Sequence, residues 1–403
     1  MVVNDVCTAS CTTASAVWKT ILVAGLNGGG KGYFALDVTN PTTPVLLWEF
    51  GTAPEYTGDL ANDDDIGYSY GNPIITKRSN GTWVVMVTSG YNNTTGSNPG
   101  KGFLYVLDAV TGMKLDKYAT GAGDDGVATT ATGPSGLAKI NGFVADGEVN
   151  NQVTKVYGGD LLGNLWRFDP NAATGTAPFQ LAVLKDGAST PKVQSITVRP
   201  ELGVANGKTV VFVGTGRYLG TSDLADTQQQ TLYAITDESP TLVSPRTSSL
   251  MVNQTLSNVS GASTRSVTSP NTVNLATGRG WYIDLPDSGE RQNVASQLVF
   301  GTLLVPTTVP SNTVCSPGGT GWLNFLDYKT GAAVSGNLVS TKTNAPIVGI
   351  NVLYVNSKPV VNIVTADNPT PTFPAVQPSF TGGSASGFTS HRAIWRELTD
   401  EQK

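Results

Sequence analysis

The feature that most constrains this fold is a phrase that recurs along the chain: a glycine, alternating apolar residues, an aspartate, a turn and a second apolar run. The copies are Gly32–Asp37, Gly102–Asp108, Gly163–Asp169, Leu232–Asp237, Gly280–Asp284 and Gly321–Asp327. A period of two is typical of β-strands, and Asp and Gly supply the reversal of a hairpin. Each phrase therefore predicts two strands of one hairpin.

The spacing of the phrases predicts a β-propeller. Their aspartates lie 43 to 71 residues apart, which fits a blade of about 40 to 50 residues plus surface insertions. The six phrases give six blades, and residues 18–23 with 393–398 from the two chain ends could form one more. We therefore predict an all-β fold, a modified seven-bladed propeller like that of quinoproteins, with a ring closed by the chain ends. Rings of six or eight blades are the alternatives, and residues 1–403 are expected to form this single domain.

Composition agrees with many short strands. Charged residues are only 14% of the chain, whereas it holds 46 glycines and 23 prolines, which divide strands with turns. No segment approaches the roughly 20 apolar residues of a membrane-spanning helix. The net charge of −5 argues against nucleic-acid binding, which needs a basic surface.

The three cysteines do not favour a zinc site. Cys7 and Cys11 are close enough to form a short-loop disulfide in an oxidising compartment, or they stay reduced. A zinc site is disfavoured because the only histidine, His391, is distant and no second cysteine pair exists. We expect His391 to be a surface residue. Cys315 is then a buried thiol or pairs with something outside this sequence.

Several segments follow the pattern of one known family. Residues 25–41, followed by Leu47–Phe50, resemble the opening of the propeller domain of the PilC/PilY family of type IV pilus tip proteins. Residues 156–169, 213–220 and 281–291 and the ending 391–398 match that pattern in the same order. The resemblance implies a propeller that forms the C-terminal half of a longer secreted protein, which agrees with the absence of a signal-peptide pattern at the first residues.

The resemblance also implies a function. Family members act at the tip of type IV pili with minor pilins, where they promote pilus assembly, oppose retraction and support twitching motility. They also contribute to cell adhesion, on host or abiotic surfaces. The resemblance therefore implies a fimbrial biogenesis factor and adhesin module without enzymatic activity, located outside a Gram-negative cell at the pilus tip or outer surface.

A calcium site is implied in the loop before residues 156–160. Family members carry aspartates at alternate positions there, because a hard cation needs several converging oxygens. The matching positions here, in chain order, are Asp146, Glu148, Asn150, the backbone carbonyl of Gln152, and Thr154. Only two of these side chains carry a formal charge, so a weak calcium site and a metal-free polar turn are both open.

Two other functions compete with this one. A quinone-dependent dehydrogenase would use the same kind of propeller, but it needs a base and a metal held by converging oxygens, and the sequence shows no such cluster. A non-adhesive scaffold of the cell envelope is a further alternative.

The run Asp63–Asp65 is expected to be a solvated loop, because consecutive carboxylates repel one another. Residues 119–136 and 239–277, rich in Thr, Ser, Asn and Gly, are expected to be exposed loops that bind partners.

Overall fold

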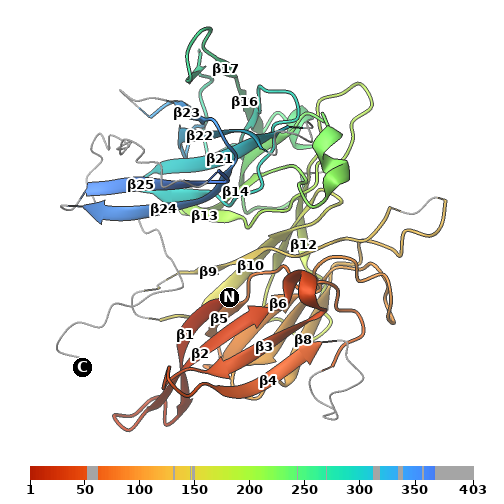
Figure 1. The fold of residues 1–403 in the computed structure, drawn as a ribbon, viewed down its shortest axis with the longest axis vertical. Coiled ribbons are helices and arrows are strands. Elements are labelled where there is room, and N and C mark those ends of the chain that lie inside the picture. Colours follow the sequence, from red (N-terminus) through yellow and green to blue (C-terminus); the bar gives the residue numbers. More distant parts are fainter. Residues whose placement is uncertain are drawn as a thin grey trace. The chain divides into compact units, whose positions relative to one another are not determined.

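The computed structural model describes most of the chain in two compact units (Figure 1). The described residues are 1–51, 62–129, 132–145, 147, 150–242, 244–268, 270–311, 318–334, 339–355 and 358–367. Within them, the first unit holds residues up to 162 and 166–180, and the second holds 163–165 and the residues from 181 onward. The helices of the described residues are single 3-10 turns at Asn27–Gly29, Thr221–Ala225 and Pro245–Thr247. None of them is long and apolar enough to cross a membrane. The predicted all-β class is confirmed.

Three four-stranded sheets begin the chain, each with its strands in sequence order. The first joins β1 (Val2–Ala9), β2 (Val17–Gly25), β3 (Gly32–Asp37) and β4 (Val45–Gly51). The second joins β5 (Ile74–Lys77), β6 (Trp83–Thr88), β7 (Phe103–Asp108) and β8 (Lys114–Ala119). The third joins β9 (Ile140–Val144), β10 (Val153–Gly159), β11 (Asn164–Phe168) and β12 (Phe179–Val183).

The second unit continues with a larger sheet in the order β13-β14-β15-β19-β16. Its strands are β13 (Glu201–Ala205), β14 (Lys208–Gly214), β15 (Thr231–Thr236), β19 (Gly280–Asp284) and β16 (Met251–Gln254). A four-stranded sheet follows, of β20 (Gln297–Val299), β21 (Thr302–Pro310), β22 (Gly319–Asp327) and β23 (Ser340–Thr343). Two ribbons complete the unit: β17 (Leu256–Asn258) with β18 (Arg265–Val267), and β24 (Ile347–Val355) with β25 (Lys358–Thr365).

Every predicted phrase contains a strand, but two phrases share one sheet. β15 and β19 pair antiparallel, with Tyr233 opposite Tyr282, so residues 232–237 and 280–284 do not mark two separate blades as predicted. The six phrases therefore fall in five sheets of four or five strands within the described residues. The prediction was wrong because the pattern recurs in two neighbouring strands of one sheet, β15 and β19, and a long insertion separates the two in sequence.

Closure of the ring by the chain ends stays a prediction. β2, which contains residues 18–23, pairs with β1 on one side and β3 on the other, so both of its edges are occupied. The partner segment 393–398 lies outside the described residues, and so does His391. The number of blades and the single domain over residues 1–403 likewise stay predictions.

Tryptophans of β4 and β19 pack against turns of the next sheet. The Trp48 indole on β4 donates a hydrogen bond to the carbonyl of Ala109 at 3.0 Å. Its ring lies against Gly112, where φ is +72° and an added Cβ would come within 2.5 Å of the ring. Trp281 on β19 makes the same hydrogen bond to the carbonyl of Tyr328, at 3.1 Å. These tryptophans therefore hold neighbouring sheets together, as expected for a propeller.

The N-terminal hairpin carries a covalent link. Cys7 and Cys11 form a disulfide with an S–S distance of 2.09 Å, beside the turn between β1 and β2. The short-loop disulfide is thus confirmed over the reduced alternative. Cys315 lies outside the described residues.

Candidate functional site

The predicted calcium loop connects β9 to β10 in the first unit. Asp146 and Glu148 lie outside the described residues, so the structure does not show whether all five candidate ligands converge. Of the others, the Asn150 amide donates to Gln152 Oε1 at 2.9 Å. The Thr154 hydroxyl donates to the carbonyl of Phe143 at 3.3 Å. Asn150 and Gln152 thus share one short polar turn, whereas Thr154 belongs to β10 and bonds to β9.

The second half of this loop is fixed to the neighbouring sheet. The carbonyl of Asn151 accepts hydrogen bonds from the Lys77 amide at 3.0 Å and the Thr76 hydroxyl at 2.7 Å. The side-chain Oδ1 of Asn151 is buried without a hydrogen-bond partner among the described residues. An unsatisfied buried oxygen is costly, and a cation or a water would satisfy it. Asn151 is not one of the predicted ligands, and the calcium site stays a prediction.

The acidic run Asp63–Asp65 was expected to be a solvated loop, but only Asp64 is exposed. The side chains of Asp63 and Asp65 are only 4% and 0% exposed, and Lys117 Nζ contacts both, at 2.8 and 2.7 Å. Lys114 Nζ contacts Asp63 at 2.7 Å. Burial opposes ionisation of Asp63, but hydrogen bonds from the two lysines hold its pKa below the usual value. Although the three carboxylates lie within reach of one metal ion, the lysines supply the positive charge.

Sequence reasoning missed these lysines because they follow the aspartates by about fifty residues and belong to β8. The sequence shows only three adjacent carboxylates, which repel in isolation. The cluster therefore joins the loop before β5 to the last strand of the same sheet. The role of Asp63 and Asp65 is therefore structural, because the lysines occupy their carboxylates.

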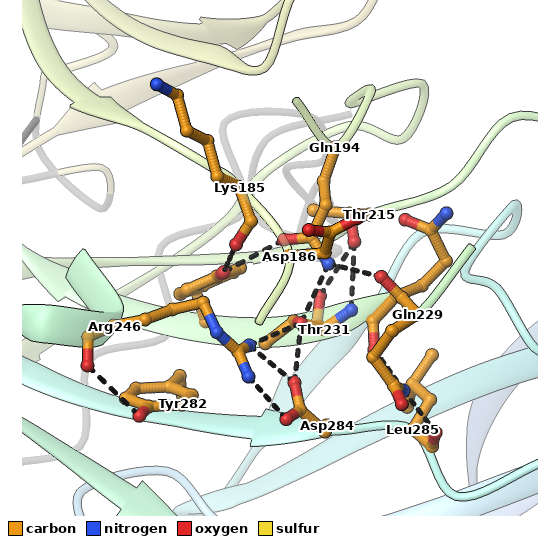
Figure 2. A network of polar contacts seen from close by, with 12 residues as sticks. Lys185, Asp186, Gln194, Thr215, Gln229, Thr231, Arg246, Tyr282, Asp284 and Leu285 are labelled. Atoms are coloured by element: carbon orange, nitrogen blue, oxygen red, sulfur yellow. Dashed lines mark hydrogen bonds and ion pairs between the residues drawn. The ribbon is translucent and has the colours of Figure 1, made fainter. Parts of the chain in front are cut away.

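A network of polar contacts lies at one end of the sheet that contains β15 and β19 (Figure 2). Arg246 and Asp284 form two parallel hydrogen bonds, both at 2.6 Å. The Thr231 hydroxyl donates to the same carboxylate at 2.8 Å. The Gln194 amide donates to Thr231 Oγ1 at 2.9 Å and to the carbonyl of Gln229 at 2.6 Å. We call the loops that meet here, residues 185–197, 214–231 and 284–292, the polar rim.

Tyr233 and Arg246 each keep one protonation state in this network. Burial raises the pKa of Tyr233 well above its ordinary value, and its hydroxyl contacts Gln194 Oε1 at 2.9 Å. The hydrogen bond to Asp284 raises the pKa of Arg246. At neutral pH the phenol therefore stays protonated and the guanidinium stays charged. This arrangement suits a rigid support for the rim loops better than acid–base chemistry.

Within the polar rim, a buried arginine holds the loop over residues 216–226. Arg291 is 2% exposed, and its guanidinium donates to four backbone carbonyls at 2.6 to 2.9 Å. The acceptors are Gly289, Arg217, Asp223 and Asp226. Arginine suits this position because its planar group carries five donors. A single side chain thus fixes the start and the end of the loop.

A buried aspartate fixes the middle of the same loop. Asp223 accepts hydrogen bonds from the backbone amides of Leu219 at 2.8 Å and Gly220 at 3.1 Å. It also accepts one from Arg217 Nε at 2.8 Å. Burial opposes ionisation, but these donors hold the pKa of Asp223 below its usual value. No motif in the sequence singled out Asp223 or Arg291 as partners, because Arg291 follows the loop by about seventy residues.

Comparisons with known proteins agree with this architecture. A family model for the PilY1 beta-propeller domain matches residues 2–262. A crystal structure of the Pseudomonas aeruginosa PilY1 C-terminal domain aligns with a TM-score of 0.67 and 26% sequence identity, over 91% of this chain and 84% of that one. The fold is therefore a β-propeller.

Curated relatives carry consistent names. The chain is 32% identical over 346 residues to a "type IV pilus biogenesis factor PilY1 homolog" of Xylella fastidiosa, over 80% of this chain and 22% of that protein. It is 31% identical over 370 residues to the "type IV pilus biogenesis factor PilY1" of Pseudomonas aeruginosa, over 79% of this chain and 30% of that protein. The chain belongs to the PilY1 β-propeller family, and it spans less than a third of the length of these relatives.

Proposed function

We propose that this chain is the propeller module of a type IV pilus biogenesis factor. The observation that carries the proposal is membership of the PilY1 propeller family over residues 2–262, together with relatives named as pilus biogenesis factors. In this role the protein promotes pilus assembly and opposes retraction. It also acts as an adhesin module that supports twitching motility and attachment to host or abiotic surfaces, without enzymatic activity.

The partners of this function are minor pilins in a complex at the pilus tip, outside a Gram-negative cell. The Cys7–Cys11 disulfide supports that location, because disulfides persist in oxidising compartments. Co-purification tests the partnership. Native pili are sheared from cells that express a tagged parent protein, and we expect minor pilins to be recovered with the tag. A tagged parent protein that is present in the sheared fraction but recovers no minor pilin contradicts the proposal.

We further propose that the loop between β9 and β10 binds calcium weakly. The buried, unpartnered Oδ1 of Asn151 and the polar turn at Asn150 and Gln152 support it. Asp146 and Glu148 would add the negative charge, with the carbonyl of Gln152 and the side chains of Asn150 and Thr154 as neutral ligands. So few charged ligands place the dissociation constant at about 10⁻⁴ to 10⁻³ M. At about 1 mM calcium the stabilisation would be only about 0.4 to 1.4 kcal/mol.

Calorimetric titration with calcium tests this site. We expect binding heat for the natural chain and its loss in Asp146→Ala. Asp125→Ala is the matched control, because Asp125 is an exposed acid in another loop of the first unit and its loss should leave the heat unchanged. A natural chain that gives no calcium-dependent heat up to several times the top of the expected range, about 10⁻³ M, would show that this loop is a metal-free polar turn.

A further inference from the structure

Tryptophans on the outer strands of two sheets contact the same position of the following sheet. The Trp48 indole donates to the carbonyl of Ala109 at 3.0 Å. The Trp281 indole donates to the carbonyl of Tyr328 at 3.1 Å. Both acceptors directly follow the aspartate that ends a phrase. We call the carbonyl in this position the docking carbonyl of its sheet.

The second sheet uses a tyrosine in a similar way. The Tyr118 hydroxyl on β8 contacts the carbonyl of Pro170, which follows Asp169, at 3.4 Å. It contacts the carbonyl of Ala172 in the same turn more closely, at 2.8 Å. An outer-strand aromatic residue that docks on a turn of the following sheet is therefore a repeated feature of this chain. Because each sheet of a closed propeller lies between two neighbours, the first sheet should receive such a residue too.

Val38 occupies the docking position of the first sheet, because it follows Asp37 at the end of the first phrase. Its amide donates to the carbonyl of Thr20 on β2 at 2.8 Å, just as the Ala109 amide donates to the carbonyl of Trp83 on β6 at 3.1 Å. The two turns are thus attached to their sheets in the same way. No residue that the structure describes donates a hydrogen bond to the Val38 carbonyl, so this docking carbonyl lacks an aromatic partner among them.

The sheet face beside Val38 is apolar and only partly covered by the described residues. Leu36 and Val38 are partly exposed. Their equivalents in the second sheet, Leu107 and Ala109, are fully buried. The residues in register with Leu36 on the other strands of the first sheet are apolar as well: Val3, Leu22 and Leu46. We call this the outer face of the first sheet, whose opposite face packs against the second sheet. A sheet that is apolar on both faces needs a neighbour on each.

One segment of the chain matches the missing partner. Trp395 is the only tryptophan outside the described residues. It stands between an apolar and a charged residue, as Trp48 does. We propose that residues 393–398 cover the outer face of the first sheet, with the Trp395 indole donating to the carbonyl of Val38 and its ring packed against Leu36. Tryptophan suits this position because it combines a large apolar ring with one hydrogen-bond donor.

This docking differs from the predicted pairing of residues 393–398 with residues 18–23 in one blade. β2 already pairs with β1 on one side and β3 on the other, so it has no free edge for the segment to join. The outer face instead offers an apolar surface and an acceptor for the indole. Loss of the segment would leave this apolar face in contact with water, which favours association between copies of the chain.

Labelling of an introduced cysteine tests the contact in the purified chain. Leu36→Cys is combined with Cys315→Ser, so that the thiol at position 36 is the one that reacts with a maleimide. We expect slow labelling in this chain and at least about tenfold faster labelling once Trp395→Ala is added, because removal of a packed tryptophan opens its surroundings. Leu219→Cys in the same background is the control, since Leu219 is 50% exposed in the second unit. Trp395→Ala should leave the labelling rate of this control unchanged.

A photochemical measurement covers the case in which thermal unfolding shows that Trp395→Ala does not fold. Benzoylphenylalanine in place of Trp395 keeps a large aromatic group at this position, and irradiation should join it to residues 36–38 of the same molecule. Labelling at position 36 that Trp395→Ala leaves unchanged overturns the docking. A crosslink to another segment or to a second copy of the chain overturns it as well, and so does the absence of any crosslink.

Discussion

The buried Arg265 gives the most demanding test of how the second unit is held together. Its side chain is fully buried, as is that of Glu290, and the guanidinium contacts both Glu290 oxygens at 2.8 and 2.7 Å. It also contacts Asp287 at 3.3 Å and lies 3.9 Å from the centre of the Trp322 ring. Through these contacts the ribbon β17–β18 is attached to the segment after β19 and to β22. We predict that Arg265→Met strongly destabilises this unit.

The expected loss of unfolding free energy in Arg265→Met follows from the burial of both Arg265 and Glu290. Removal of one partner of a buried ion pair leaves an uncompensated charge and costs about 3 to 5 kcal/mol. The double variant Arg265→Met/Glu290→Leu removes both charges and fills the space with apolar atoms, so it should recover most of that loss. The exposed pair Lys19–Asp37, with Lys19 37% exposed, is the control. Lys19→Met should cost no more than about 1 kcal/mol.

Urea unfolding followed by tryptophan fluorescence measures these differences, because Trp322 contacts the guanidinium directly. We expect the free energy of unfolding to fall steeply in the single variant and to return toward the natural value in the double variant. A loss in Arg265→Met no larger than that in Lys19→Met would refute the reasoning. So would a double variant that is as unstable as the single one, since the penalty would then not come from the buried charge.

Three further predictions concern single contacts. Trp281→Phe should lower the free energy of unfolding by about 1 to 3 kcal/mol in urea titrations, because the buried carbonyl of Tyr328 loses its donor; an unchanged midpoint would contradict this. Hydrogen bonds from Lys19 and Thr39 lower the pKa of Asp37 to about 2. The stabilisation that ionised Asp37 gives the fold should therefore be complete above about pH 4 and be lost as the pH falls toward 2. Asp37→Asn should flatten the stability profile in that window, and an identical profile would show that Asp37 contributes nothing. Replacing Cys7 and Cys11 with serine should lower the free energy of unfolding by about 2 kcal/mol, the chain-entropy value for so short a loop, and melting with and without reductant checks it.

The strands were predictable because their signal is local. Alternating aromatic and apolar residues that end at an aspartate marked a strand at each phrase, including β3 and β22, which end at Asp37 and Asp327. The assignment of strands to sheets was less predictable. β15 and β19 pair across an insertion of more than forty residues, and no local pattern shows which strand returns to which sheet.

Contacts within the candidate sites were harder to predict from sequence than the strands were. Proximity in sequence was enough to name the disulfide between Cys7 and Cys11 as one of two alternatives, whereas the lysines that neutralise Asp63 and Asp65 come from β8. The contacts of Arg291 with the loop around Asp223 join segments about seventy residues apart. Buried contacts of charged side chains depend on tertiary packing, so a sequence shows the charges but not their partners.

The most direct test of the account is deletion of the parent gene in its own bacterium. Surface pili are counted by electron microscopy and twitching zones are measured, with the full-length gene restored as the control. We predict that deletion removes or greatly reduces surface pili and twitching and that the restored gene recovers both. Normal piliation and twitching in the deletion strain would contradict the proposal that this propeller belongs to a pilus biogenesis factor.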